Sequence, residues 1–306
     1  CADDQKQDAY TDYTTQMGDI AADSVKTGRN LAELVTEPGL KEAVLETKLS
    51  GLVQAQQQGI ARAEALDVPG PLRPAHEKAI EALAFRANGM RGLLEAFRAT
   101  ATSQDASAAG QQLAAQATRL QASDVVWQDL FRVPAVDAMT AEGVTGLNAP
   151  VSVFVVNPDL YSSRSLASIW TRIHGASTGG TPTGLHGTSI TSATVQPANE
   201  QLSTEEETTI IISQDLAIDV AVTNSGDFQE VGVEVTLTIP TQPSPIVKKG
   251  KIDVIDEGET KTVTFRDFGD APFDRTTIQV SVTPVLGEEN ETNNTAEYPV
   301  IFSLEP

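Results

Sequence analysis

The stretch Gly-Ala-Ser-Thr-Gly-Gly-Thr-Pro-Thr-Gly-Leu-His-Gly, residues 175–187, separates two parts of the chain that differ in hydrophobic pattern. It holds five Gly and four Ser or Thr in 13 residues, together with one Pro. Such a composition cannot bury a core and is typical of a flexible linker. Before this stretch apolar residues recur every three or four positions, and after it they recur every second position. We therefore predict a helical first half, a linker at 175–187 and a β-rich second half.

The first half predicts an antiparallel four-helix bundle over residues 9–133, preceded by an acidic tether at residues 1–8. Apolar seams at helical spacing run through 9–35, 40–67 and 72–102, and a fourth follows the capping candidates Ser103 and Asp105. Each helix must bury its apolar stripe against the others, and short turns make neighbouring helices antiparallel. Residues 134–174 form an intermediate segment, with an extended run at 149–156 and one further helix at 158–173.

Residues 188–306 predict an antiparallel β-sandwich, with seven or eight short strands separated by turn clusters. Val233, Val235, Leu237 and Ile239 show the alternation of a strand with one buried face. Asn224 and Gly226 supply a turn that tolerates positive φ. This half is also the acidic one, because residues 197–306 hold 21 acidic and 6 basic residues, a net charge of −15.

Three segments of the second half resemble a bacterial CARDB-type immunoglobulin-like domain. They are Asp215 to Gly226 (DLAIDVAVTNSG), Gly232 to Ile239, and Val280 to Asn294 (VSVTPVLGEENETNN), which ends in the turn and the Asn pair typical of that class. The resemblance implies a sandwich module of the kind appended to secreted or surface proteins as a spacer or binding unit. The chain as a whole resembles a group of actinobacterial envelope lipoproteins, which supplies no activity to transfer.

Cys1 is the one cysteine of the 306 residues, and the acidic sequence Ala2-Asp3-Asp4 follows it. This start resembles a mature bacterial lipoprotein, whose first residue carries the lipid on its thiol. We therefore expect lipidation at Cys1 and an extracytoplasmic location, with the chain anchored to the cell membrane or cell surface. A trimmed sequence that happens to begin with Cys is the alternative.

The composition argues against several classes of function. A net charge of −21, from 42 acidic and 21 basic residues, disfavours nucleic acid as a partner. The three histidines, at 76, 174 and 186, are not accompanied by a Gly-x-Ser-x-Gly motif. Gly179 to Gly184 lacks the Gly-Lys-Ser/Thr ending of a phosphate-binding loop. We expect a protein that is not an enzyme and needs no cofactor.

Two kinds of ligand site remain as candidates. The loop residues Glu288, Glu289, Glu291 and Asn293 offer oxygen atoms that calcium accepts, although they lack the order of an EF-hand loop. A solvated acidic turn is the alternative for that loop. Aromatic residues of the helical half could line a pocket for an apolar ligand, although at helical spacing they also fit a plain core; they are Trp127, Trp170, Phe85, Phe97 and Phe131.

These observations predict a lipid-anchored envelope protein that binds a surface protein or glycan, or assembles with itself, through its sandwich and its helical bundle. The alternation from Val231 to Ile239 suggests a strand edge that could recruit another chain by strand addition. A carrier or sensor of a small apolar ligand bound between the helices is the alternative. Hydrolysis by carboxylates alone also stays open, because no pair of acids is singled out.

Overall fold

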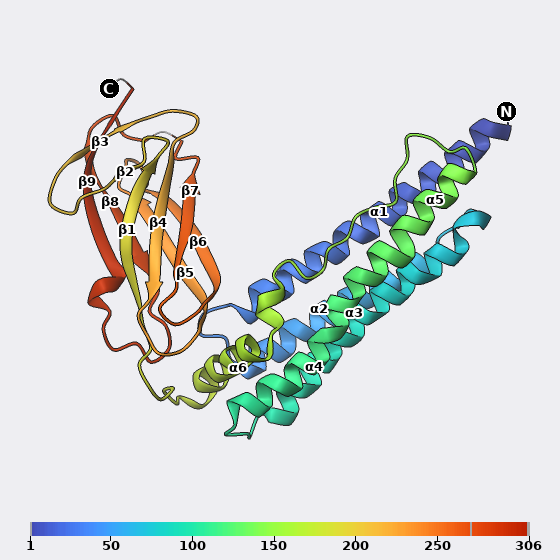
Figure 1. The fold of residues 1–306 in the computed structure, drawn as a ribbon, viewed down its shortest axis with the longest axis horizontal. Coiled ribbons are helices and arrows are strands. Elements are labelled where there is room, and N and C mark those ends of the chain that lie inside the picture. Colours follow the sequence, from blue (N-terminus) through green and yellow to red (C-terminus); the bar gives the residue numbers. More distant parts are fainter. Residues whose placement is uncertain (1, 270, 305–306) are drawn as a thin grey trace. The chain divides into compact units, whose positions relative to one another are not determined.

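The computed structural model describes residues 2–269 and 271–304 and divides the chain into two compact units, Cys1–Ser177 and Thr178–Pro306. Figure 1 shows helices in the first unit and strands in the second. The boundary falls inside the segment where the hydrophobic pattern changes. The two units are described separately below as the helical unit and the sandwich unit.

The helical unit is built from long helices joined by short turns (Figure 1). Its elements are α1 (Ala2–Val35), α2 (Glu42–Glu64), η1 (Gly70–Leu72), α3 (Arg73–Thr100), α4 (Ala106–Val125), the π-helical η2 (Val126–Arg132), α5 (Val133–Ala141), η3 (Pro158–Tyr161) and α6 (Ser163–Thr178). The helix α1 packs against α2, α2 against α3, and α3 against α4. Residues such as Leu49, Leu83 and Leu113, which the helical period assigns to the seams, are completely buried.

An extended segment, residues 149–155, lies between α1 and α4, and we call it the strap. Its Ser152 hydroxyl donates to the carbonyl oxygen of Ala21 in α1, and its Phe154 amide donates to Asp124 in α4. Among the described residues α1 and α4 do not pack closely against each other. The predicted antiparallel four-helix bundle is therefore not confirmed, because a returning stretch of chain fills the side between the first and the fourth helix.

The N-terminal segment is helical from Ala2, where the sequence predicted a tether over residues 1–8. Two contacts hold the N-terminal part of α1 against the end of α5 and the residues that follow it. The Lys6 ammonium donates to the carbonyl oxygen of Glu142 at 2.6 Å, and the Gln7 side chain donates to that of Thr145 at 3.2 Å. Polar residues that favour helix in the absence of Gly or Pro explain why the helix continues here.

The fourth helical run begins as predicted and ends later. The Asp105 side chain caps α4 by accepting from the Ala108 amide at 2.9 Å. The run then continues through η2 and α5 to Ala141, beyond the predicted end at residue 133. Pro134 in the first turn of α5 has no N–H to donate and crowds the preceding turn. The wider π-helical turn directly before it makes room for the proline.

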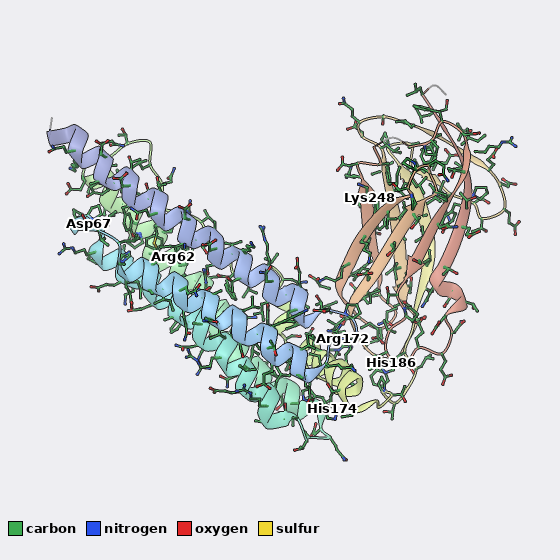
Figure 2. The ribbon with its side chains drawn as sticks, turned by 180° about the vertical axis from the view of Figure 1, so that it is seen from behind. Arg62, Asp67, Arg172, His174, His186 and Lys248 are labelled. Atoms are coloured by element: carbon green, nitrogen blue, oxygen red, sulfur yellow. The ribbon has the colours of Figure 1, made fainter. Side chains whose placement is uncertain are left out.

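The helix α6 binds the ends of two other helices. Arg172 donates to the carbonyl oxygen of Glu37 at 2.9 Å and to that of Val35, which ends α1. The Ser177 hydroxyl accepts from the amide of Glu42, the first residue of α2, at 2.8 Å. Because α6 extends to Thr178, the first four residues of the predicted linker at 175–187 are helical instead. Figure 2 labels Arg172 on this helix.

The sandwich unit consists of two sheets, in the orders β2-β1-β4-β7 and β3-β9-β8-β5-β6. The strands are β1 (Thr188–Gln196), β2 (Glu200–Gln201), β3 (Thr208–Ile211), β4 (Ala217–Asn224), β5 (Glu230–Ile239), β6 (Ile246–Ile255), β7 (Thr260–Arg266), β8 (Arg275–Val282) and β9 (Thr295–Ser303). The alternating apolar residues of β4, β5 and β8 form the core between the sheets. Asn224 is 1% exposed and binds the turn after β4, where its Oδ1 accepts from the Gly226 amide.

One strand pair departs from the predicted antiparallel sandwich, because β3 runs parallel to β9. The chain leaves β2 in one sheet and enters β3 in the other after a loop that contains Glu205, Glu206 and Glu207. Two strands joined by a tight hairpin must run antiparallel. The strands β3 and β9 are far apart in the chain, so no hairpin fixes their relative direction and they can pair in parallel. The second sheet is therefore mixed.

The strand predicted to recruit a partner, residues 231–239, is an interior strand of its sheet. It belongs to β5, which pairs with β6 on one side and with β8 on the other. The two edges of this sheet are β3 and β6. On β6, Lys248 pairs with the buried Leu237 and thus lies on the inner face; Figure 2 labels Lys248. A charged side chain on the inner face of an edge strand disfavours the addition of another strand.

Candidate functional site

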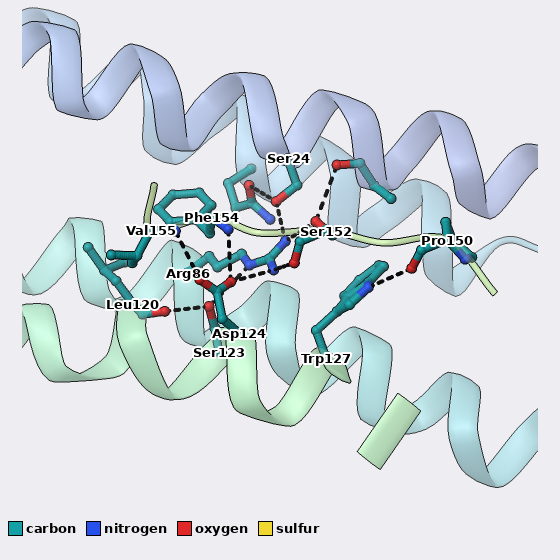
Figure 3. Close-up of polar contacts among 12 residues, drawn as sticks. Ser24, Arg86, Leu120, Ser123, Asp124, Trp127, Pro150, Ser152, Phe154 and Val155 are labelled. Atoms are coloured by element: carbon teal, nitrogen blue, oxygen red, sulfur yellow. Dashed lines mark hydrogen bonds and ion pairs between the residues drawn. The ribbon is translucent and has the colours of Figure 1, made fainter. Parts of the chain in front are cut away.

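Arg86 is the most deeply buried charged residue of the helical unit. It lies in the middle of α3 and is 0% exposed. A guanidinium has five N–H donors. Each of the five has an acceptor here: Nε donates to the Ser123 hydroxyl, Nη1 to the hydroxyls of Ser24 and Ser152, and Nη2 to Asp124 and to the Ser152 carbonyl oxygen (Figure 3). We call this set the Arg86 cluster.

Asp124 connects the Arg86 cluster to the main chain of the strap. Its Oδ1 lies 3.0 Å from Nη2 of Arg86 and accepts from the Phe154 amide at 2.8 Å. Its Oδ2 accepts from the Val155 amide at 2.9 Å. The carboxylate thus neutralises the buried cation and fixes two consecutive residues of the strap. A buried charge is tolerated when it is paired and fully hydrogen-bonded, as Arg86 is.

Two aromatic rings lie against the guanidinium. The carbon Cζ of Arg86 lies 5.1 Å from the centre of the Trp127 ring and 5.3 Å from that of Phe154. Cation–π attraction is strongest where water is excluded. Burial lowers the pKa of Arg86 to about 10, and the charge of Asp124 opposes this shift. Arg86 is therefore still protonated at neutral pH.

The sequence contains one indication of this site, a charged residue at an apolar seam position of the third helix, which was not among the predicted site residues. Arg86 falls among the seam positions of the third helix, next to Leu83 and Met90. A charged residue at a seam position requires buried partners, and Ser24 and Ser123 occupy positions that face it. The strap itself, predicted as an extended run at 149–156, gave no indication that its main chain would be bound by side chains.

His76 is buried beside Tyr13 in the helical unit. Its Nδ1 lies 3.1 Å from the Tyr13 hydroxyl, and the two rings meet edge to face. Burial lowers the pKa of His76, whereas a hydrogen bond with the backbone of Ala63 and the charge of Glu77 raise it. Burial also raises the pKa of Tyr13, so its hydroxyl stays neutral and can donate. The arrangement satisfies the buried imidazole within the core.

The other two histidines each contact one aromatic ring and one carboxylate. His174 stacks on Trp170 with ring centres 4.6 Å apart, and its Nδ1 lies 3.2 Å from Glu42. In the sandwich unit, His186 stacks on Phe228 at 5.0 Å, and its Nδ1 lies 2.6 Å from Glu230. Figure 2 labels both histidines.

The end of the predicted linker is attached to the sandwich unit rather than free. The Leu185 carbonyl oxygen accepts from the Asp227 amide at 2.8 Å, and that of Gly187 accepts from the Ser225 amide at 2.9 Å. His186 belongs to this attached segment. Upstream, Gly179 and Gly184 adopt positive φ, consistent with a loop of irregular conformation.

The candidate calcium ligands have different environments in the structure. Glu288 accepts from two backbone amides, those of Thr188 at 2.8 Å and Val285 at 2.9 Å, which fixes the loop to β1. Glu289 and Glu291 are exposed. Asn293 is half-buried, and its Oδ1 has no hydrogen-bond partner in the structure. Within residues 2–269 and 271–304, no group of three or more His, Cys, Asp or Glu side chains is placed to hold a metal ion.

The aromatic residues proposed to line a pocket have different environments. Trp127 and Phe131 lie in the core and meet edge to face at 4.8 Å. Trp170 is 5% exposed and donates from Nε1 to the Thr100 hydroxyl. Phe97 is buried, whereas Phe85 is 39% exposed on α3. These contacts are those of core residues and of one surface residue.

Cys1 lies outside the described residues, so its lipidation stays a prediction. In the part of the chain that the structure describes, none of the helices has the length and apolar character needed to span a bilayer.

Comparison with known proteins gives partial similarities only. No protein-family model and no curated protein matches the chain. Among solved structures, a CARDB domain from Pyrococcus furiosus is 19% identical and covers 40% of this chain and 100% of its own, with a TM-score of 0.28. The same domain in complex with di-metal ions covers 41% of this chain at 19% identity, with a TM-score of 0.29. A domain of a protein described as a cell surface protein from Methanosarcina acetivorans is 17% identical and covers 40% of this chain and 95% of its own, with a TM-score of 0.31.

Proposed function

We propose that this chain is a non-enzymatic cell-envelope protein that binds a partner through the surfaces of its sandwich and helical units. In this proposal the sandwich unit is a CARDB-like, immunoglobulin-like module and the chain works outside the cytoplasm. The segments that carry the CARDB resemblance form β4, β5, β8 and the loop that leads into β9.

The observation that carries the proposal is the saturation of the Arg86 cluster. All five donors of the one fully buried cation in the described chain bond to groups of the same helical unit. A guanidinium that binds a substrate phosphate or carboxylate needs free donors that point at the substrate. Arg86 instead holds the strap, which supports a structural role for the most unusual polar centre of the fold.

The histidines support the same conclusion. Each of the three has an aromatic neighbour and a hydrogen-bond partner, and they lie in separate parts of the chain. General acid–base catalysis needs such a side chain within reach of the proton that it transfers. His76 is used within the core and His186 within an attached segment, so both serve packing.

Charge and exposed apolar side chains indicate where a partner could bind. The net charge of −15 over residues 197–306 favours a partner with a basic or cation-covered surface. On the same unit Phe273 is 65% exposed, and aromatic residues are enriched at protein interfaces. On the helical unit, Phe85 is the corresponding exposed aromatic residue.

Site-specific photo-crosslinking in the native host tests this function. A photo-reactive phenylalanine replaces Phe273 in one variant and Phe85 in another. We expect at least one position to give a discrete adduct that excess unlabelled chain competes away and that weakens at high salt. Val247, which is 49% exposed on the edge strand β6, is the matched control position. A failure of both positions to give a competed adduct, with the chain fully expressed, would contradict the proposal.

Lipid attachment is tested separately. Mass spectrometry of the native N-terminus should find the mass of a diacylglycerol group on Cys1. An unmodified thiol on protein taken from its own host would remove the lipid anchor from the proposal and leave the binding function to the crosslinking result.

A further inference from the structure

The strap is bound mainly through its main chain. Five of its main-chain groups bond to side chains of α3, α4 and η2, and these groups are the carbonyl oxygens of Ala149, Pro150 and Ser152 and the amides of Phe154 and Val155. The side chains that bind them are those of Arg86, Asp124, Trp127 and Arg132. Contacts of this kind recognise an extended conformation and carry little dependence on the bound sequence.

The bidentate contact of Asp124 is the centre of this recognition. One carboxylate accepts from two consecutive amides of the strap, at 2.8 and 2.9 Å. On the other side of the same residues, Gly28 of α1 faces the Phe154 carbonyl oxygen, and a side chain at position 28 would collide with the strap. Helix α1 therefore leaves a path that is shaped for a polypeptide backbone.

Over residues 151–154 the side chains of the strap alternate between the solvent and the interior, and Val155, which follows Phe154, is buried as well. Ser152 is 3% exposed and Phe154 0%, whereas Val151 is 60% and Val153 47% exposed. The inward hydroxyl accepts from Arg86 and the inward ring packs against it. A small hydroxyl residue followed two positions later by an aromatic residue is thus the pattern that the site selects, while the outward positions accept any side chain.

We propose that the surface formed by α1, α3, α4 and η2 is a recognition site for an extended peptide of the pattern Ser-x-Phe, occupied in cis by the strap. This inference rests on the proposed function, because it gives the helical unit a ligand class, namely an unstructured segment of a partner. The cis segment is present at a high effective concentration, so a peptide added to the wild-type chain competes poorly. Weakening the strap without altering the site should reveal the binding.

The test uses the full chain and a fluorescent synthetic peptide with the sequence of residues 148–158. In the Phe154→Ala variant the strap loses its inward ring, and the residues that bind the strap are unchanged. We expect the peptide to bind this variant saturably and roughly 10- to 100-fold more tightly than it binds the wild-type chain. It should also raise the melting temperature of the variant by mass action.

Three controls identify the site and the pattern. Val153→Ala changes an outward residue and should bind the peptide as weakly as the wild-type chain. Adding Asp124→Asn to the Phe154→Ala variant removes the bidentate carboxylate and should weaken binding by about 10-fold or more. A peptide in which the phenylalanine is replaced by alanine should bind about 10-fold more weakly than the original.

Three outcomes would contradict the inference. If Phe154→Ala is folded by circular dichroism and the peptide does not bind it, or binds equally well after Asp124→Asn, the inference is wrong. If Phe154→Ala is unfolded, Phe154→Leu replaces it, since this change keeps most of the volume. If neither variant folds even with millimolar peptide present, the strap is an integral core segment and the inference is also wrong. The purified chain suffices for this test, so its failure leaves the crosslinking result on the envelope partner unaffected.

Discussion

Gly28 of α1 lies directly against the carbonyl oxygen of Phe154 in the strap, with no room between them for a Cβ atom. The contact joins residues that are far apart in the chain. It shows that a glycine inside a 34-residue helix is required by packing rather than tolerated. At Gly18 in the same helix, a Cβ atom would meet nothing within 4 Å apart from the neighbouring backbone of α1.

This contrast gives the first prediction. Gly28→Ala should destabilise the helical unit by about 2–4 kcal/mol, because the backbone of the strap cannot shift as a flexible side chain could. Gly18→Ala, the matched control, should instead stabilise it by about 0.5–1 kcal/mol, as expected at an open helical position. Urea unfolding followed by circular dichroism at 222 nm measures both changes. Equal effects of the two substitutions would show that the strap does not press on α1.

The second prediction concerns the buried cation. Arg86→Met should destabilise the helical unit by about 3–5 kcal/mol, because Asp124 and three serine hydroxyls lose their partner. Arg98→Met is the control, since Arg98 pairs with Glu46 at the surface, where its side chain is 53% exposed. Surface pairs contribute about 0–1 kcal/mol. In thermal unfolding, the melting temperature of Arg86→Met should therefore lie clearly below that of Arg98→Met. Similar melting temperatures would show that the Arg86 cluster contributes little to stability.

The third prediction follows from the direction of the His76 pKa. Because burial lowers this pKa below the ordinary value of 6.5, the unfolded chain binds a proton at a higher pH than the folded chain. The free energy of unfolding should therefore fall as the pH drops from 6.5 toward the lowered pKa, and the contribution is fully present above 6.5. Comparing wild type with His76→Gln between pH 7.5 and 5.0 isolates the effect. The variant should show a shallower loss of stability over that window.

The fourth prediction tests the turn that closes β4. The amide Nδ2 of Asn224 donates to the carbonyl oxygens of Phe228 and Ile255, while Oδ1 accepts from Gly226. Asn224→Ala would leave these groups without that partner, at a cost of about 2–4 kcal/mol to the sandwich unit. The control is Asn290→Ala, which removes only exposed hydrogen bonds from Thr292 and should cost less than about 1 kcal/mol. Hydrogen exchange of the β4 amides would localise the effect.

The division into helical and β-rich parts could be predicted because the spacing of apolar residues is visible in the local sequence and needs no knowledge of the fold. The alternation from Val233 to Ile239 and the cap at Asp105 required no knowledge of distant residues, and both are as predicted. The parallel pairing of β3 with β9 depends instead on how a loop crosses between sheets, which no local pattern encodes.

The candidate sites were harder to predict for the same reason. The role of Arg86 is apparent only from its hydrogen bonds with Ser24 and Ser152, which are 62 and 66 residues away in the chain. Glu288 was predicted as a possible ligand because carboxylates cluster in its loop, whereas its hydrogen bonds with the amides of Thr188 and Val285 could be found only from the fold. Sequence identifies the chemical types present, whereas the fold decides which of them meet.

Arg172 and Ser177 of α6 bind the end of α1 and the start of α2, and α6 is the last helix before the sandwich unit in the sequence. Tension applied along the polypeptide from its C-terminal side therefore acts on α6 before it acts on the other helices, and α6 is held by these polar contacts together with its buried apolar residues, such as Leu166 and Ile169. In a single-molecule pulling experiment, α6 should detach before the other helices, and an Arg172→Met substitution should lower that first rupture force while leaving the later, main rupture unchanged.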